Sequence, residues 1–211
     1  MKHLLIIGAR GYGREVYNTA MESIGYGEYF DIKGFLDDKS DALDGYEGYS
    51  PIIDSVENYE IDNDDVFVCA LGDVKYKKHY VDLIRHKGGE FFTLIHKTAY
   101  IGKNTEIGVG CILSRYDQIS CDVKIGDFVT MNHMVIVGHD AEIGDFSHLN
   151  CNSFMGGYAK LEKSVTLQTS AKIMPHKKCG NYSTVGVCSV VLRNVKEGKT
   201  VYGNPASEID F

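Results

Sequence analysis

The sequence predicts a chain of two parts, a small α/β unit followed by a parallel β solenoid. The first observation is a repeat: from Ile101 to Val185, every sixth residue is apolar at fifteen consecutive positions. A six-residue period does not match the 3.6 residues of a helical turn, but it fits a short strand and a tight corner that stack into a solenoid. The second observation is a short apolar run, Leu4–Ile7, which leads into a glycine-containing turn and then a helical pattern. We therefore expect an α/β unit over residues 1–95 and an all-β unit over residues 96–211.

Glycine has a fixed place in the repeat. It follows the apolar residue at eight positions, which are Gly102, Gly108, Gly126, Gly138, Gly144, Gly156, Gly180 and Gly186. Two explanations fit a glycine at a corner: a positive φ, or a close approach of neighbouring backbone that a Cβ would block. The sequence does not decide between them.

The first 95 residues are expected to be Rossmann-like. Beyond the first strand, the pattern predicts strands over Ile32–Leu36 and Val66–Leu71, a helix over Lys75–His86, and a last strand within Phe91–His96 that leads into the repeat. The turn after the first strand has the spacing GxxGxG rather than the GxGxxG of dinucleotide-binding proteins. Its helix N-terminal amides could hold a phosphate, or the turn could be purely structural. Asp37 and Asp38 end the second strand, where a carboxylate could accept from a ribose or base edge or form a solvated acidic turn.

Composition and charge narrow the function classes. The 211 residues include 22 Lys and Arg against 29 Asp and Glu, which gives a formal net charge of −7. This balance argues against broad nucleic-acid binding, which requires a cationic face. No apolar run approaches the roughly 18 residues that cross a bilayer, and the first apolar run looks like a strand rather than a signal peptide. The six cysteines form no CxxC pair, so we expect reduced thiols in the cytoplasm and no zinc ribbon.

Motifs along nearly the whole chain carry a resemblance to a known family. They are Gly8–Glu15, Phe35–Asp38, Ile95–His96, Asn132–His133, Gly138–Asp140 and the closing Tyr202–Ala206. With the six-residue repeat, they resemble the left-handed parallel β-helix acyltransferases. The similarity is greatest to bacterial sugar acyltransferases, which include sialic acid O-acetyltransferases and UDP-4-amino-sugar N-acetyltransferases. The resemblance implies a left-handed β-helix of about five triangular coils, a homotrimer with active sites between neighbouring β-helices, acetyl-CoA as co-substrate and a nucleotide-sugar acceptor.

The chemistry is expected near His139. Acyl transfer from a thioester needs a base for the acceptor proton, donors for the developing oxyanion, and positioning. Histidine is the natural base near neutral pH, and the resemblance assigns this role to His139 within Gly138–Asp140. Asp140 could orient the imidazole or raise its basicity. One coil of 18 residues leads from His139 to Gly157, whose backbone amide would, by the resemblance, contact the thioester.

The resemblance also places the two substrates. Asn132 would lie near the base and the acceptor, His148 near the acetyl carbonyl, and Gly186 on a rung that lines the CoA arm. Asn132 and His148 could instead be exposed corner residues. The nucleotide-sugar would occupy the N-terminal domain and point its acceptor group at His139, and no metal is expected. The residues expected to line its pocket are Gly11, Gly13, Asp37, Asp38 and Gly72.

The coils after Gly157, which would line the bound CoA, depart from the family pattern. After Gly157, the Ile-Gly pairs are replaced by Leu161-Glu162, Leu167-Gln168 and Ile173-Met174, so the donor site could be reshaped. Four residues in this region could meet a CoA phosphate or form a solvated face: His176, Lys177, Lys178 and Arg193.

These observations predict an acetyl-CoA-dependent N-acetyltransferase that acts on a nucleotide-linked amino sugar by direct transfer. Two alternatives remain open: a sugar O-acetyltransferase acting on a sialic acid or a polysaccharide precursor, and a non-catalytic trimeric binding scaffold. A histidine base serves N- and O-transfer alike. A covalent route through Cys151 is disfavoured because the sequence shows no activating partner for the thiol.

Overall fold

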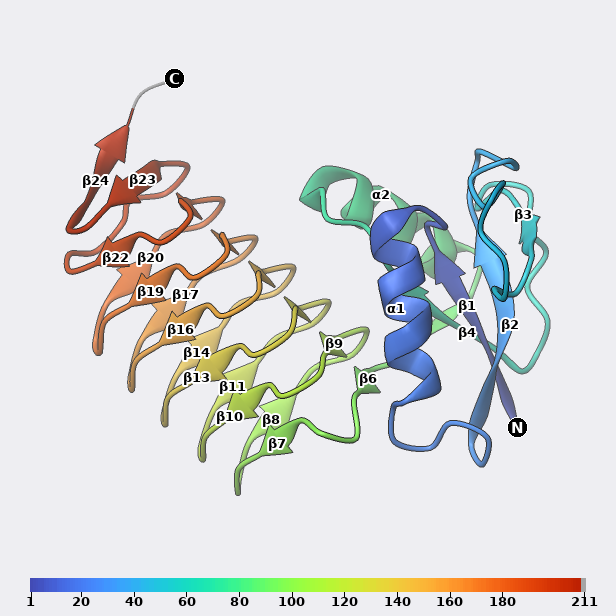
Figure 1. Cartoon of the computed structure of the whole chain (residues 1–211), viewed down its shortest axis with the longest axis horizontal. Coiled ribbons are helices and arrows are strands. Elements are labelled where there is room, and N and C mark those ends of the chain that lie inside the picture. Colours follow the sequence, from blue (N-terminus) through green and yellow to red (C-terminus); the bar gives the residue numbers. More distant parts are fainter. Residues whose placement is uncertain (210–211) are drawn as a thin grey trace. The chain divides into compact units, whose positions relative to one another are not determined.

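The structure consists of two units (Figure 1). The computed structural model describes residues 1–209, and the chain divides into Met1–Lys97 and Thr98–Phe211. The first unit contains two helices and a sheet, and the second is a stack of short strands. Within residues 1–209, neither helix has the length and apolar character needed to span a bilayer.

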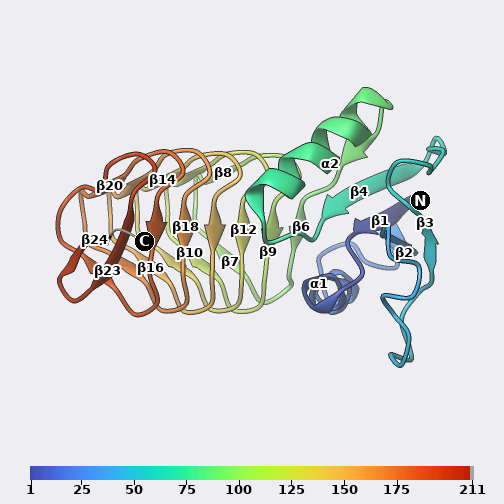
Figure 2. The ribbon, with the colours of Figure 1, turned by 90° about the horizontal axis from the view of Figure 1, so that it is seen from above.

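A parallel five-stranded sheet forms the centre of the first unit. Its strands, in the order β3-β2-β1-β4-β5, are β1 (Lys2–Ile7), β2 (Phe30–Leu36), β3 (Ile52–Asp54), β4 (Asp65–Cys69) and β5 (Glu90–Phe91). α1 (Gly11–Met21) follows β1, α2 (Val74–His86) follows β4, and the helices lie on opposite faces of the sheet (Figure 2). β6 (Leu94–Ile95) comes last in the unit. The strand order reverses between β1 and β4, and open α/β sheets bind ligands at the carboxyl ends of strands at such a point.

The predicted α/β class of this unit is confirmed. The strand expected within Phe91–His96 is present as two short strands, β5 and β6. The structure adds β3, an edge strand of three residues, two of them exposed. Periodicity finds buried strands because they carry apolar runs, and an exposed edge this short carries none.

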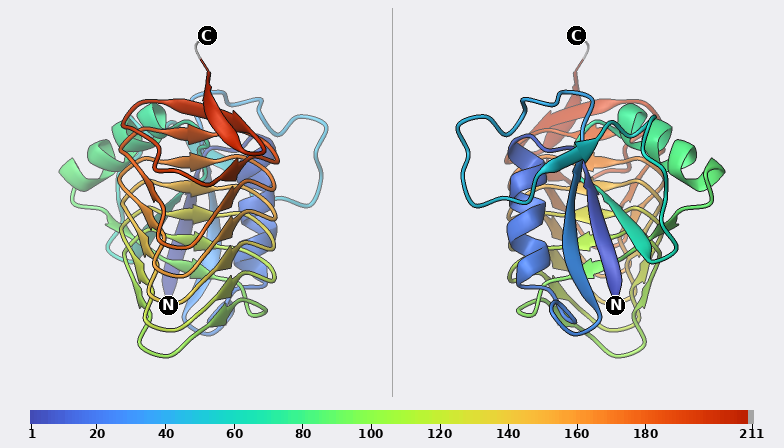
Figure 3. Two further views of the ribbon diagram at one scale, coloured as in Figure 1. Left: turned by 90° about the vertical axis from the view of Figure 1, so that its left-hand side faces the viewer. Right: turned by 90° about the vertical axis from the view of Figure 1, so that its right-hand side faces the viewer.

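Short strands, of two residues each except for the last two, stack into three flat faces in the second unit, which Figure 3 shows as a triangle along the stack. Face A contains β7 (Tyr100–Ile101), β10 (Gln118–Ile119), β13 (Ile136–Val137), β16 (Phe154–Met155), β19 (Lys172–Ile173) and β22 (Val190–Val191). Face B contains β8 (Glu106–Ile107), β11 (Lys124–Ile125), β14 (Glu142–Ile143), β17 (Lys160–Leu161) and β20 (Lys178–Cys179). Face C contains β9 (Ile112–Leu113), β12 (Thr130–Met131), β15 (His148–Leu149), β18 (Thr166–Leu167), β21 (Thr184–Val185), β23 (Thr200–Gly203) and β24 (Ala206–Ile209).

Successive coils are in register at 18 residues. Gln118 pairs in parallel with Ile136, and Ile136 pairs with Phe154. The chain runs from face A to B to C and back to A, so the corners are named A–B, B–C and C–A. The last pair differs, because β24 runs antiparallel to β23.

The corners explain the repeat glycines by close approach rather than by positive φ. Positive φ recurs at every sixth residue from Asn104 to Cys188, and those residues are not glycine except at Gly110. A Cβ on Gly102 would lie 2.4 Å from the carbonyl carbon of Ser120 in the next coil. The repeat glycine therefore lets two backbones stack, while a residue two positions later makes the left-handed bend.

The interior of the β-helix is apolar, with one acidic exception. The repeat positions from Leu113 to Val185 are at most 4% exposed. Asp117 is also fully buried, and its carboxylate accepts from the backbone N–H of Ser114 at 2.7 Å and of Val135 at 2.9 Å. Burial raises the pKa of Asp117 to about 8 despite these two bonds. The Asp117 side chain therefore links Ser114, at the other end of the same C–A corner, to Val135 in the next coil.

Candidate active site

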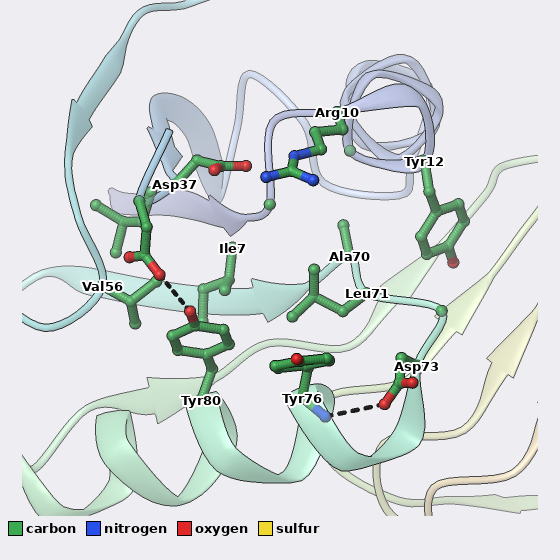
Figure 4. Close-up of a pocket in the computed structure, with 15 residues that line it drawn as sticks. Ile7, Arg10, Tyr12, Asp37, Val56, Ala70, Leu71, Asp73, Tyr76 and Tyr80 are labelled. Atoms are coloured by element: carbon green, nitrogen blue, oxygen red, sulfur yellow. Dashed lines mark hydrogen bonds between the residues drawn. The ribbon is translucent and has the colours of Figure 1, made fainter. Parts of the chain in front are cut away.

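A cavity of about 540 Å³ opens where the strand order of the first unit reverses (Figure 4). This volume lies within the range of small-molecule sites. Four of the five residues expected there line it: Gly13, Asp37, Asp38 and Gly72. Gly11 does not; it lines a shallower neighbouring depression together with Arg10, Arg14 and Lys39.

The two aspartates after β2 have different partners. Asp37 accepts from the backbone N–H of Ala9 at 2.8 Å and of Lys39 at 2.9 Å, so it fixes the turn after β1. Asp38 accepts from the hydroxyl of Tyr80 on α2, and this hydrogen bond raises the pKa of Tyr80. The acidic pair is therefore not a freely solvated turn: one carboxylate holds the backbone, and the other forms a polar pair at the cavity wall.

The start of α1 presents positive charge to this cavity. Arg10 is the N-cap residue, no side chain caps the helix, and the first turn carries no acidic residue. The Arg10 guanidinium points over the cavity (Figure 4). Uncapped amides and a nearby cation suit a phosphate group. Gly13 has a packing role here, because a Cβ would lie 1.9 Å from the carbonyl oxygen of Gly8.

His139 lies at the A–B corner, two residues after the end of β13. Its Nδ1 lies 2.8 Å from Asp140 Oδ2, and with the proton on Nδ1 the lone pair of Nε2 is free to accept another. The imidazole is 54% exposed. A Cβ on Gly157 would lie 2.8 Å from Nε2 and from Cε1. The structure thus brings His139, Asp140 and Gly157 together, with Gly157 stacked against the imidazole.

A further carboxylate lies in the coil before Asp140. Asp122 accepts from Asn104 Nδ2 at 2.9 Å. This bond, a second from the Cys121 thiol, and the positive charge of protonated His139 lower the pKa of Asp122. The A–B corner therefore carries two carboxylates close to the imidazole.

Two aromatic rings follow His139 along the A–B corner. The rings of His139 and Tyr158 meet edge to face, with centroids 5.3 Å apart and planes at 89°. Tyr158 stacks in turn on His176, at 4.9 Å and 5°. The first ring contact places Tyr158 beside the imidazole.

Asn132 and His148 lie together, but at a different place from His139. Asn132, at the C–A corner, donates from Nδ2 to His148 Nε2 at 3.3 Å and to Asn150 Oδ1 at 3.2 Å. His148 on face C is only 9% exposed. Within one chain, the C–A and A–B corners border opposite sides of face A. A single β-helix therefore does not bring the Asn132–His148 pair to His139.

The remaining predicted positions have structural surroundings. A Cβ on Gly186 would lie 2.3 Å from the ring of Tyr202, so this glycine makes room for that ring. All six cysteines are free, and Cys151 is partly exposed. Within residues 1–209, no group of three or more His, Cys, Asp or Glu side chains is arranged to hold a metal ion.

Sequence reasoning missed three side chains at these sites. Arg10 and Tyr80 contribute to the cavity of the first unit, and Tyr158 contacts His139. Tyr76 and Tyr80 are four residues apart in the predicted helix, and that spacing places both on one helical face. The 18-residue register that places Gly157 on His139 also places Tyr158 one coil after Asp140, whereas no comparable signal marked Arg10.

Comparison with known proteins agrees with this architecture. Residues 3–84 match the family model of the PglD N-terminal domain. A GDP-perosamine N-acetyltransferase of Escherichia coli O157:H7 is 28% identical over 221 residues, which cover 97% of this chain and 95% of that protein.

Solved structures share the whole fold. The acetyltransferase domain of PglB from Neisseria gonorrhoeae FA1090 gives a TM-score of 0.89 at 25% identity, over 99% of this chain and 100% of that one. The same domain has been solved with acetyl coenzyme A. PerB from Caulobacter crescentus, solved with CoA and GDP-perosamine, gives 0.89 at 21% identity, over 100% of this chain and 98% of that one. At that identity, the likeness to PerB concerns the fold.

The fold is a left-handed parallel β-helix with a small N-terminal α/β unit, as the sequence predicted, and the acetyltransferases of known structure share it. More particularly, its first unit matches the PglD N-terminal domain, and the whole chain is a homologue of a GDP-perosamine N-acetyltransferase.

Proposed function

We propose that the protein transfers the acetyl group of acetyl-CoA to the amino group of a nucleotide-linked sugar, with His139 as general base. One observation carries the proposal: Asp140 holds Nδ1 of His139 at 2.8 Å, and Nε2 faces the backbone of Gly157. Similarity to a GDP-perosamine N-acetyltransferase over 97% of the chain supports the choice of acceptor and donor.

The acceptor nucleotide would bind in the cavity of the first unit. The uncapped start of α1 and the Arg10 guanidinium suit the negative charge of a diphosphate. Asp38 and Tyr80 provide an acceptor and an aromatic surface at the same cavity. These groups favour a nucleotide-linked sugar over a free sugar. A free sugar has no phosphate, so it would make no use of Arg10 and the uncapped start of α1.

The transfer needs one base and one set of oxyanion donors. Nε2 of His139 takes the proton from the sugar amine as its nitrogen attacks the thioester carbon. The resulting tetrahedral oxyanion collapses, the carbon–sulfur bond breaks, and the thiolate of CoA leaves and takes the proton carried by the His139 imidazole. Asp140 keeps the imidazole in the tautomer that can accept this proton. The Gly157 amide is the donor proposed for the oxyanion, because a residue without Cβ lets the ligand approach its backbone.

A homotrimer is part of this proposal. The Asn132–His148 pair and His139 border opposite sides of face A in one chain, so a neighbouring β-helix is needed to bring the two groups into one site. Face A also exposes the apolar side chain of Ile136, at 46%. Burial of an exposed apolar side chain favours association.

The test measures release of the CoA thiol from acetyl-CoA with UDP-, GDP-, dTDP- and CMP-linked sugars that carry either an amine or only hydroxyls. We expect turnover with an amino sugar, and a kcat about 10²–10⁴-fold lower in His139→Asn. His86→Asn, an exposed histidine near the end of α2, is the control and should match the wild type.

Three results would contradict the proposal. Turnover only with hydroxyl sugars would favour an O-acetyltransferase. Absence of CoA binding would favour a binding scaffold. Full activity of His139→Asn would exclude the proposed base. Light scattering of the wild type and of Ile136→Asp tests the trimer, which we expect the substitution to dissociate.

A further inference from the structure

The direction of the His139 side chain is not fixed by burial. The imidazole is 54% exposed and turns about two single bonds, so its neighbours decide where Nε2 points. Asp140 holds the ring at Nδ1, at 2.8 Å. The backbone of Gly157 lies against Nε2 and Cε1. A hydrogen bond at one atom still permits the ring to swing about it, so a second lateral contact is needed to define one orientation.

Tyr158 supplies that contact. Its ring meets the imidazole at 5.3 Å with the planes at 89°, an edge-to-face geometry that aromatic pairs favour. The backbone N–H of Tyr158 also donates to the carbonyl oxygen of His139 at 3.0 Å. The two residues are therefore joined through both ring and backbone.

Tyr158 is itself held in place. His176, one coil further on, stacks on its ring at 4.9 Å and 5°. The N–H of His176 donates to the carbonyl oxygen of Gly157 at 3.1 Å. Three rings thus follow one another along the A–B corner. Because Tyr158 is 52% exposed, it contributes little to the core, and its ring contacts need another explanation than stability.

We propose that Tyr158 is a positioning residue for His139: its ring, backed by His176, limits the swing of the imidazole about the Asp140 bond and keeps Nε2 directed at the acceptor. The inference rests on the proposed role of His139 as base. It assigns Tyr158 no contact with either substrate.

Kinetics separate this role from a structural one. Loss of one aromatic contact corresponds to roughly a three- to tenfold change in rate. We expect Tyr158→Ala to lower kcat by that factor without changing KM for acetyl-CoA or for the acceptor. Tyr158→Phe, which keeps the ring, should restore the rate, and His176→Ala should give a smaller loss. Tyr182→Ala is the matched control, since Tyr182 is 57% exposed with φ 57° but lies at the B–C corner.

A double-mutant cycle adds a second kinetic readout. If Tyr158 acts only through the imidazole, Tyr158→Ala should have no further effect on the residual activity of His139→Asn. A rise in KM for acetyl-CoA at constant kcat would overturn the proposal, because the ring would then bind the donor. Equal losses in Tyr158→Phe and Tyr158→Ala, or no loss in either, would overturn it as well.

Proton NMR of the free protein tests the positioning without activity. His139→Asn identifies the imidazole resonances of His139, which should shift in Tyr158→Ala and stay in place in Tyr158→Phe. If the wild type acetylates no nucleotide-linked sugar, the proposed function fails, and this spectrum still reports whether Tyr158 orients His139. Unchanged His139 resonances in Tyr158→Ala would refute the positioning even in an active enzyme.

Discussion

Gly157→Ala is the most direct test of the proposed site, because the added methyl group meets the imidazole first. The new Cβ would lie 2.8 Å from Nε2 and Cε1 of His139, where ordinary contact begins at 3.4 Å. The imidazole must therefore move by about 0.6 Å or more. That motion works against its bond to Asp140. Misplacement of a reacting group by about 1 Å can lower a rate 10²-fold, so we expect kcat/KM to fall by about 10- to 100-fold.

The fold should tolerate the same substitution. The atoms displaced belong to the far end of a half-exposed side chain, so we expect the melting temperature of Gly157→Ala to change by no more than a few degrees. Gly144→Ala is the matched comparison, since its Cβ would lie 2.6 Å from the carbonyl carbon of Glu162 in the next coil. Backbone cannot move aside so easily, and overpacking of this kind costs about 1–3 kcal/mol.

The assay pairs acetyl transfer with thermal unfolding for both variants. We expect Gly157→Ala to be folded and slow, and Gly144→Ala to be destabilised but normally active per folded molecule. A folded Gly157→Ala with wild-type kcat/KM would refute the stacking of Gly157 on a working base. Equal destabilisation of the two variants would refute the distinction between side-chain and backbone contacts.

Further predictions concern other parts of the chain. Asp117→Ala leaves two buried N–H groups without an acceptor, so the free energy of unfolding in urea should fall by about 2–6 kcal/mol; a loss below 0.5 kcal/mol would contradict this. Because the folded pKa of Asp117 is about 8 against 3.8 for the free group, the folded state keeps a proton that the unfolded chain releases. The stabilisation of the folded state by the proton on Asp117 should therefore be complete below about pH 4 and be lost as pH rises to about 8. Asp117→Asn should remove this pH dependence of stability. Arg10→Gln should weaken binding of nucleoside diphosphates about tenfold by calorimetry and reduce its salt dependence, and an unchanged affinity would remove Arg10 from the phosphate site. Asn150→Ala removes the acceptor 3.2 Å from Asn132 and should lower kcat several-fold with little change in melting temperature; equal kcat values would leave Asn150 with no part in placing Asn132.

The repeat was predictable from sequence because every coil has the same spacing of buried apolar residues. An apolar residue every six positions can be buried only in a solenoid, and 18 residues per coil then places Gly157 on His139 before any coordinates are known. The assignment of positive φ was less predictable. Tyr158 takes a left-handed conformation although tyrosine is not among the residues that favour it.

Long-range side-chain pairs were the main features beyond sequence reasoning. The bond between Asp38 and Tyr80 joins residues 42 positions apart on different elements, and no local pattern encodes it. The bond between His139 and Asp140 was doubtful from sequence, because neighbouring side chains often point apart. The left-handed conformation of Asp140, with φ 57°, turns the chain at the corner where that bond forms.

The 18-residue register limits how the length of the second unit can change. Deletion of a single residue within a coil would misalign that coil with its neighbours, and deletion of six would move the later strands to the neighbouring face relative to the earlier ones. Only whole coils can be added or removed without changing the face on which the later strands lie. A coil inserted after His176 would lengthen the surface beyond the three rings and leave His139, Asp140 and Gly157 in contact. In such a scaffold, the length of the surface beyond the three rings can vary in steps of one coil, independently of the arrangement around His139.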